Sequence, residues 1–130
     1  MKLRYLNITF VIIFFSLVLS LSAKQNVNEG AAYLPFAQEM PTPIGGLSAI
    51  YKKVVYPEIA QKAGVQGKVY LLAFINENGG VDDVKIIKGI GGGCDEAAMK
   101  AVKETKFKPG KNKGKPVKVK FSLAIKFKLN

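Results

Sequence analysis

The sequence predicts an α+β domain in which a three-stranded antiparallel sheet packs against helices, in the order α-α-β-β-α-β. Three observations support this fold class. Two strand-like segments flank Asn78-Gly79-Gly80, the residue types that tolerate the positive φ angles of a tight hairpin turn. A stripe of small residues then recurs at helical spacing. Near its end the chain alternates strictly between apolar residues and mostly lysine, which is typical of a strand with one buried face.

Two short helices are expected before the sheet. Residues 47–53 place three apolar side chains on one side of a helix, namely Leu47, Ile50 and Tyr51. Pro57 ends this first helix, because a proline disfavours the α region for the residue before it. The same proline suits the first turn of a second helix over residues 57–63. Gly64 is expected to end that helix as a left-handed cap.

The strands follow in the order of the predicted sheet. Residues 68–76 are apolar on both alternating faces, so this strand is expected in the middle of the sheet. Residues 81–88 return beside it as the hairpin partner. Residues 117–129 carry seven apolar side chains on one face and four lysines on the other. This last strand is expected at the open side of the sheet, because lysines on an edge discourage uncontrolled pairing.

A third helix is expected between the hairpin and the last strand. It runs over residues 95–106, with Asp95 as its N-cap, and ends before Pro109-Gly110. Small and β-branched side chains form its inner stripe and let it lie close to the sheet, namely Ala97, Ala98, Ala101, Val102 and Thr105.

The composition excludes the common catalytic pairs. The chain has no His and one Cys, so Ser-His and Cys-His nucleophile pairs, His-bearing zinc sites and internal disulfides are all ruled out. The glycine-rich run 89–93 could hold an anion, but it lacks the Gly-Lys-Ser/Thr ending of a phosphate loop, which favours a plain turn. Cys94 is interpreted as a small buried residue at a helix start rather than a nucleophile. We therefore expect no enzyme and no cofactor.

Two pairs of acidic residues raise the question of a metal site. They are Asp82-Asp83 and Asp95-Glu96. Adjacent residues on a strand point to opposite faces, so the first pair is not expected to converge on one ion. A solvated pair and a helix cap are therefore favoured over metal binding.

The positive charge is concentrated at one end of the chain. The net charge is +11, yet residues 24–99 carry a net −1 and residues 100–128 a net +10. The only Arg is Arg4 and Trp is absent, so the domain has no guanidinium to read a base edge and no indole to stack on bases. We expect no nucleic-acid partner and interpret the lysines as edge protection and partner steering.

Residues 1–23 have the pattern of an export segment. Lys2 and Arg4 precede the uncharged stretch 5–23, which ends in small residues. Two interpretations stay open: a cleaved signal peptide, or an uncleaved anchor in the inner membrane, since 19 uncharged residues lie near the lower limit for spanning a bilayer. Both place the remainder outside the cytoplasm. Residues 24–38 are expected to form a short linker and residues 39–130 the domain.

The chain also carries an ordered set of motifs from about Glu39 to Leu129. The set comprises Met40-Pro41, Gly45-Gly46, Tyr56-Pro57-x-x-Ala60-x-x-x-Gly64-x-x-Gly67-x-Val69, Phe74, Val81-x-x-Val84, Asp95-x-x-Ala98, Phe107-x-Pro109-Gly110, Gly114-Lys115-Pro116-Val117-x-Val119 and Phe127-x-Leu129. Together these motifs resemble the TonB C-terminal domain family.

The resemblance implies a periplasmic domain that works through protein binding. Proteins of this family couple an inner-membrane motor to outer-membrane receptors, and the domain captures a short receptor segment, the TonB box, beside its final strand. Carried over by position, the partner-binding residues are Lys53, Val54, Val55, Tyr56 and Pro57, together with Val117, Lys118, Val119, Lys120, Phe121 and Ser122. No catalytic residue, metal or cofactor is implied.

Two functional interpretations follow, and both use the open strand edge. In the first, the protein binds the TonB box by strand addition in energy transduction for receptor-mediated transport, with inner-membrane motor proteins as further partners if residues 5–23 form an anchor. In the second, it is a soluble periplasmic scaffold without a motor. The pattern alone also permits a third interpretation, in which the edge has no binding function and its lysines serve only to keep it soluble. An exposed edge further permits a strand-exchanged homodimer.

Two departures from the family pattern affect these interpretations. Residues 24–38 contain one proline and reach only ~50 Å when fully extended, which is short for a spacer that transmits force across the periplasm. Ala124 stands where relatives often have proline, so the last strand is expected to run straighter and to pair further.

Overall fold

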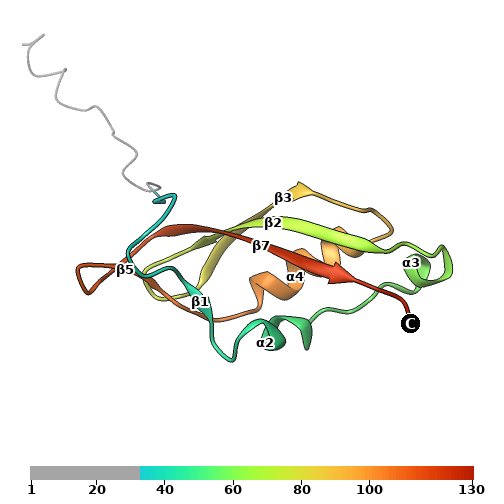
Figure 1. Ribbon diagram of the computed structural model, residues 1–130, viewed down its shortest axis with the longest axis horizontal. Coiled ribbons are helices and arrows are strands. Elements are labelled where there is room, and N and C mark those ends of the chain that lie inside the picture. The colour runs from blue at the N-terminus through green and yellow to red at the C-terminus, as the bar shows by residue number, and fades with distance from the viewer. Residues whose placement is uncertain (1–32) are drawn as a thin grey trace, which may run out of the picture. The chain divides into compact units, whose positions relative to one another are not determined.

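The computed structural model describes residues 33–130 (Figure 1). The predicted export segment 1–23, and residues 24–32 of the predicted linker, lie outside the described residues. Within the part described, no helix is long and apolar enough to cross a membrane.

The predicted α+β fold and strand order are confirmed. The main sheet is antiparallel and contains β2 (Gly67–Ile75), β3 (Val81–Lys88) and β7 (Val119–Phe127), in the order β3-β2-β7. The apolar strand β2 lies in the middle, as its two-faced pattern predicted. β2 and β7 pair over nine consecutive residues without a bulge, from Gly67 opposite Phe127 to Ile75 opposite Val119. The register shifts of the sheet occur only between β2 and β3.

The three helices form where the sequence predicts them, with shorter bounds. They are α2 (Leu47–Tyr51), α3 (Glu58–Lys62) and α4 (Cys94–Lys103). The expected apolar face of α2 is wrong in part: Ile50 is buried, but the side chains of Leu47 and Tyr51 remain 54% and 41% exposed. The reason is that α2 is only five residues long, and Ile50 is the one side chain of the helix that is buried.

The N-cap expected at Asp95 is also wrong. Gly93 occupies the N-cap position with φ 82°, and Cys94 begins the helix. The Asp95 carboxylate instead accepts the backbone N–H of Ile90 at 2.8 Å and that of Gly91 at 3.4 Å, so it closes the glycine-rich turn that precedes α4.

Four short strands complete the fold and shorten the predicted last strand. β1 (Thr42–Pro43) pairs with β4 (Phe107–Lys108), and β5 (Gly110–Asn112) pairs with β6 (Lys115–Val117). The alternating stretch expected over residues 117–129 is therefore divided. Val117 belongs to the β5-β6 hairpin, Lys118 is a break, and β7 runs from Val119 to Phe127. A tight turn at Lys113-Gly114, where both φ angles are positive, makes this extra hairpin.

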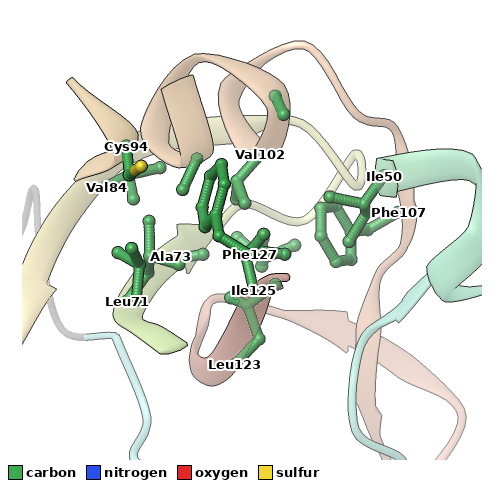
Figure 2. Close-up of a cluster of buried hydrophobic side chains, with 14 of the residues drawn as sticks. Ile50, Leu71, Ala73, Val84, Cys94, Val102, Phe107, Leu123, Ile125 and Phe127 are labelled. Carbon is green, nitrogen blue, oxygen red and sulfur yellow. The ribbon is translucent and has the colours of Figure 1, made fainter. Parts of the chain in front are cut away.

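One apolar core joins the sheet to α4 and α2 (Figure 2). Residues of β2 and β7 supply its floor and small residues of α4 its cover, which confirms the predicted stripe. Cys94 is buried in this core, as expected, and burial raises the pKa of its thiol. The largest fully buried side chains include Ile50, Val69, Leu71, Ile75, Val102, Phe107, Val119 and Ile125.

The hairpin turn between β2 and β3 is tied to this core at one point. The backbone N–H of Phe107 donates to the carbonyl oxygen of Gly79 at 2.9 Å. Gly79 has φ 81°, and a Cβ atom added there would collide with the Phe107 carbonyl oxygen. Glycine is therefore required at this position both for the backbone angle and for the close approach.

We predict that Gly79→Ala lowers the free energy of unfolding substantially more than Gly114→Ala. Gly114 has a similar φ of 76° but no atom within 4 Å of an added Cβ, so its substitution should cost only the left-handed strain of about 1–2 kcal/mol. The clash at Gly79 should add about 1–3 kcal/mol to that strain. Urea unfolding of both variants measures the difference, and equal losses would contradict the tie between the turn and the core.

Candidate functional site

The outer edge of β7 is the main candidate site. β7 pairs with β2 along one side, and backbone groups of a strand alternate between its two edges. The N–H of Lys120 and the carbonyl oxygen of Lys118 point outward, because they bond to Leu34 rather than to β2. By alternation the backbone groups of Ser122 and Ala124 face the same way. Within residues 33–130 no other segment forms a backbone hydrogen bond with these two residues on that side.

The far end of this edge is closed by a side chain. The backbone N–H of Lys126 donates to the hydroxyl oxygen of Tyr51 at 3.1 Å. Beside it the rings of Tyr56 and Phe127 meet edge to face, with their centres 5.2 Å apart. The Tyr56 hydroxyl donates to the carbonyl oxygen of Val65, and burial raises the pKa of this tyrosine. These contacts fix the end of β7 against the loop that follows α2.

The near end of the edge is covered by residues 33–39, which we call the strap. Leu34 pairs with β7 in parallel: its N–H donates to the Lys118 carbonyl oxygen and its carbonyl oxygen accepts the Lys120 N–H, both at 2.8 Å. Further along, Glu39 exchanges two backbone hydrogen bonds with Lys111 of β5, at 3.0 and 2.9 Å. Contacts with the domain thus begin before residue 39, where the sequence placed its start.

Tyr33 fastens the beginning of the strap to the wet face of the sheet. Its ring meets that of Phe74 edge to face at 5.1 Å, and the Lys118 Nζ lies 5.6 Å from its ring centre. Its hydroxyl donates to the carboxylate of Asp82, which also accepts a hydrogen bond of 2.8 Å from Asn76. Asp82 is thus a bonded strand residue rather than half of the freely solvated pair that the sequence suggested.

The Tyr33–Asp82 hydrogen bond shifts the pKa values of both side chains. It raises the pKa of Tyr33 to about 12, because the carboxylate holds the phenol proton. The same bond lowers the pKa of Asp82. The raised pKa of Tyr33 makes the contact stabilising below the ordinary tyrosine pKa and lost as pH rises through about 12. The lowered pKa of Asp82 makes it stabilising above the ordinary Asp pKa and lost as pH falls.

Positive charge surrounds the edge on the wet face. The Nζ atoms of Lys85 and Lys120 lie 5.3 and 6.0 Å from the ring centre of Phe74, and Lys118 stands over Tyr33. At these distances the ammonium groups are attracted to the faces of the aromatic rings. The edge is therefore flanked by cations that can meet acidic groups of a partner.

The second predicted region, residues 53–57, lies on a different surface. Val54 and Tyr56 pack against the core, whereas Lys53, Val55 and Pro57 turn toward α4. There they line an open groove of about 500 Å³ together with Glu96, Ala97, Lys100 and Glu104. The Lys53 Nζ donates to the Glu104 carbonyl oxygen at 2.6 Å, and Val55 is 74% exposed.

The two predicted regions are therefore separated. Residues 53–57 lie beside Phe127 at one end of β7, and Val119 lies at the other, about 25 Å away at the usual rise per strand residue. Among the predicted residues, the backbone of Val119 and Phe121 faces β2, and Val117 belongs to β6. Lys118, Lys120 and Ser122 supply the outward groups. Ala124, which the sequence singled out for its missing proline, borders the edge, whereas the sequence did not point to Tyr33, Leu34 or Tyr51 as parts of this site.

We predict that Asp82→Asn lowers the pKa of Tyr33 from about 12 toward its ordinary value of 10. An amide cannot hold the phenol proton as a carboxylate does, and it brings no negative charge. The pH dependence of the Tyr33 Cζ chemical shift measures this change. Asp83→Asn is the control, because Asp83 acts on Tyr33 only weakly and through space. An unchanged Tyr33 midpoint in Asp82→Asn would contradict the contact.

The chain is similar to proteins named for TonB. The family model described as Gram-negative bacterial TonB protein C-terminal matches residues 52–129. The protein TonB of Vibrio cholerae is 32% identical over 75 residues, which cover 57% of this chain and 31% of that protein. The protein tonB2 of Pseudomonas aeruginosa is 36% identical over 76 residues, with 58% and 28% covered. The matched part thus spans about a third of the length of these curated relatives.

Solved structures include a similar chain. The solution structure of the TonB C-terminal domain of Helicobacter pylori is 28% identical and covers 62% of this chain and 86% of that one, with a TM-score of 0.48. The family model, which matches more than half of the chain including α3, the whole main sheet and α4, identifies this protein as a member of the TonB C-terminal domain family.

Proposed function

We propose that this chain is a periplasmic protein that binds the TonB box of outer-membrane receptors by adding the receptor segment as a strand to the outer edge of β7. The observation that carries this proposal is the edge itself. Ser122 and Ala124 direct backbone N–H and C=O groups outward, and within residues 33–130 no backbone partner meets them. Backbone groups of this kind form hydrogen bonds with any extended peptide, whatever its side chains.

The shape of β7 favours strand addition. Its nine residues pair with β2 without a bulge, so the outward groups are regularly spaced along the edge. Ala124, in place of the proline that relatives often carry, keeps a donor in the row. A regular row of donors and acceptors gives an incoming strand several bonds in one register.

The charge around the edge favours a partner segment with acidic residues. Lys118, Lys120 and Lys126 belong to the edge strand or its break, and Lys85 lies across the wet face. Such a cluster speeds encounter with an acidic peptide and disfavours a basic one, while the strand bonds supply affinity. We include Lys53, Val55 and Pro57 as contacts for the part of the receptor that continues beyond the strand, because they line the groove beside α4.

Energy transduction is the proposed setting of this binding, with motor proteins of the inner membrane as further partners if residues 5–23 stay as an anchor. One observation favours the alternative, a periplasmic scaffold without a motor. The strap fixes residues 33–39 to the domain, so nine residues, 24–32, would separate it from an anchor ending at residue 23. Nine residues reach only ~30 Å fully extended.

The mass of the native N-terminus distinguishes the two settings. A protein that begins at Met1 and sediments with membranes supports coupling to a motor. A soluble protein that begins near Lys24 excludes direct coupling and supports the scaffold. Either result leaves strand addition intact as the mode of binding.

We predict that Ser122→Pro weakens peptide binding at least tenfold while the domain stays folded. The Ser122 N–H faces away from β2, so proline removes a donor to the incoming strand and no bond of the sheet. Ser122→Val is the matched control, because it changes the side chain and keeps the N–H. Fluorescence anisotropy with 15-residue synthetic peptides, copied from the N-termini of outer-membrane receptors of the same genome, measures the affinity.

Ser122→Pro that unfolds like the unmodified chain and binds with the same affinity would overturn strand addition at this edge. Loss of binding in Ser122→Val as well would show that the side chain, and not the backbone donor, carries the interaction.

A further inference from the structure

We infer that the strap, residues 33–39, is an internal competitor for the partner-binding edge: an incoming strand that pairs along the whole of β7 must first displace Leu34 from Lys118 and Lys120. This inference rests on the proposed function, because it concerns the same edge. It adds a regulatory contact that lies outside the matched family region, which begins at residue 52.

The strap occupies the edge in the manner of a partner strand. Leu34 uses the outward carbonyl oxygen of Lys118 and the outward N–H of Lys120 in two hydrogen bonds of 2.8 Å. Tyr51 takes the outward N–H of Lys126 at the other end. Between these two contacts, the Lys120 carbonyl oxygen and the N–H and C=O groups of Ser122 and Ala124 are left open. A strand pairing only there covers two residue pairs, so a longer one needs the place of Leu34.

The strap is built to stop after one pair. In a parallel ladder the next strap donor would be the N–H of Phe36, aimed at the Lys120 carbonyl oxygen. Among the described residues that bond is absent, and Phe36 is 74% exposed. Pro35, between the two, has no N–H and holds Leu34 extended. The contact at the edge therefore consists of one residue pair, which a longer ladder can outcompete.

Side-chain and backbone contacts on either side of Leu34 also help to hold the strap on the domain, and they lie outside the core. Tyr33 packs edge to face against Phe74 on the wet face of the sheet and donates a hydrogen bond to Asp82. Glu39, paired with Lys111, holds the other end of the strap on the domain. Release of Tyr33 and Leu34 therefore requires no opening of the core, and the strap can remain tethered while its edge contact is lost.

A competing strap lowers the apparent affinity of a partner by the fraction of molecules in which the edge is open. Two backbone hydrogen bonds with modest net strength, plus the Tyr33 contacts, correspond to a closed form favoured by about tenfold. Removing the strap should tighten binding by the same factor.

The test uses the full chain and the same 15-residue receptor peptides in anisotropy titrations. Leu34→Pro removes the donor to Lys118 and sets its ring against that carbonyl oxygen, so both bonds of the pair should be lost and binding should tighten by up to about tenfold. Tyr33→Phe removes only the hydrogen bond to Asp82 and should give a smaller gain. Phe36→Ala is the matched control in the strap, and its affinity should equal that of the unmodified chain because Phe36 makes no ladder bond.

Amide hydrogen exchange without peptide tests the strap by itself. The Lys120 amide should be protected in the unmodified chain and in Phe36→Ala, and it should exchange rapidly in Leu34→Pro. The Ser122 amide should exchange rapidly in all three. When peptide is added to the unmodified chain, the Leu34 amide should lose protection.

The outcomes separate this inference from the proposed function. Tighter binding by Leu34→Pro, with loss of Leu34 protection in the complex, supports competition. Equal affinity of Leu34→Pro and the unmodified chain, or a Leu34 amide that stays protected at saturating peptide, overturns the inference and leaves strand addition standing. Absence of binding in every variant, with Lys120 exchange still raised in Leu34→Pro, overturns the proposed function and with it the competition.

Discussion

The pairing of β2 with β7 is the constraint on which the rest of the structure depends. β2 contributes buried side chains along its length and is paired with β3 on one edge and with β7 on the other. β7 therefore pairs with one strand of the main sheet, and its second edge faces outward. The uninterrupted register holds one face of β7 in the core and leaves its outer backbone groups in a regular row. The same pairing that completes the core therefore leaves one edge of β7 available for hydrogen bonds with another strand.

What covers that edge explains how a sheet protein avoids uncontrolled association. Lysines on the wet face oppose pairing with a second copy, Tyr51 closes one end, and Leu34 occupies the other. These devices differ in strength. Charge acts on any approaching chain, whereas the strap makes a specific contact that a matching strand can replace. Protection and binding are thus two uses of the same backbone groups.

Sequence patterns predicted the elements with strong periodicity and failed where local geometry decides. The hairpin, the central position of β2 and the small-residue face of α4 follow from alternation and helical spacing. The break at Lys118 was missed, because the alternation continues through it although residues 115–117 pair with β5 and not with β2. Asp95 is of a residue type favoured at N-caps. The helix nevertheless begins at Cys94, because three glycines with positive φ angles precede it and Gly93 takes the N-cap position.

The candidate site was predicted in outline and not in detail. Lysine alternation indicated which strand is exposed, but residues 53–57 and 117–122 do not form one surface. Leu34 carries no periodic signal, because a single residue pair leaves no pattern along the chain. Its role follows only from the spatial arrangement, as does that of Tyr51, whose hydroxyl reaches a strand 75 residues away.

The most direct test of the account is to detect the hydrogen bonds between the two chains. Couplings across hydrogen bonds, measured by NMR between the labelled protein and a carbonyl-labelled receptor peptide, should connect the amide nitrogens of Ser122 and Ala124 to peptide carbonyl carbons. A saturated complex in which these couplings are absent, and in which only residues 53–57 and α4 respond to the peptide, would contradict strand addition at β7.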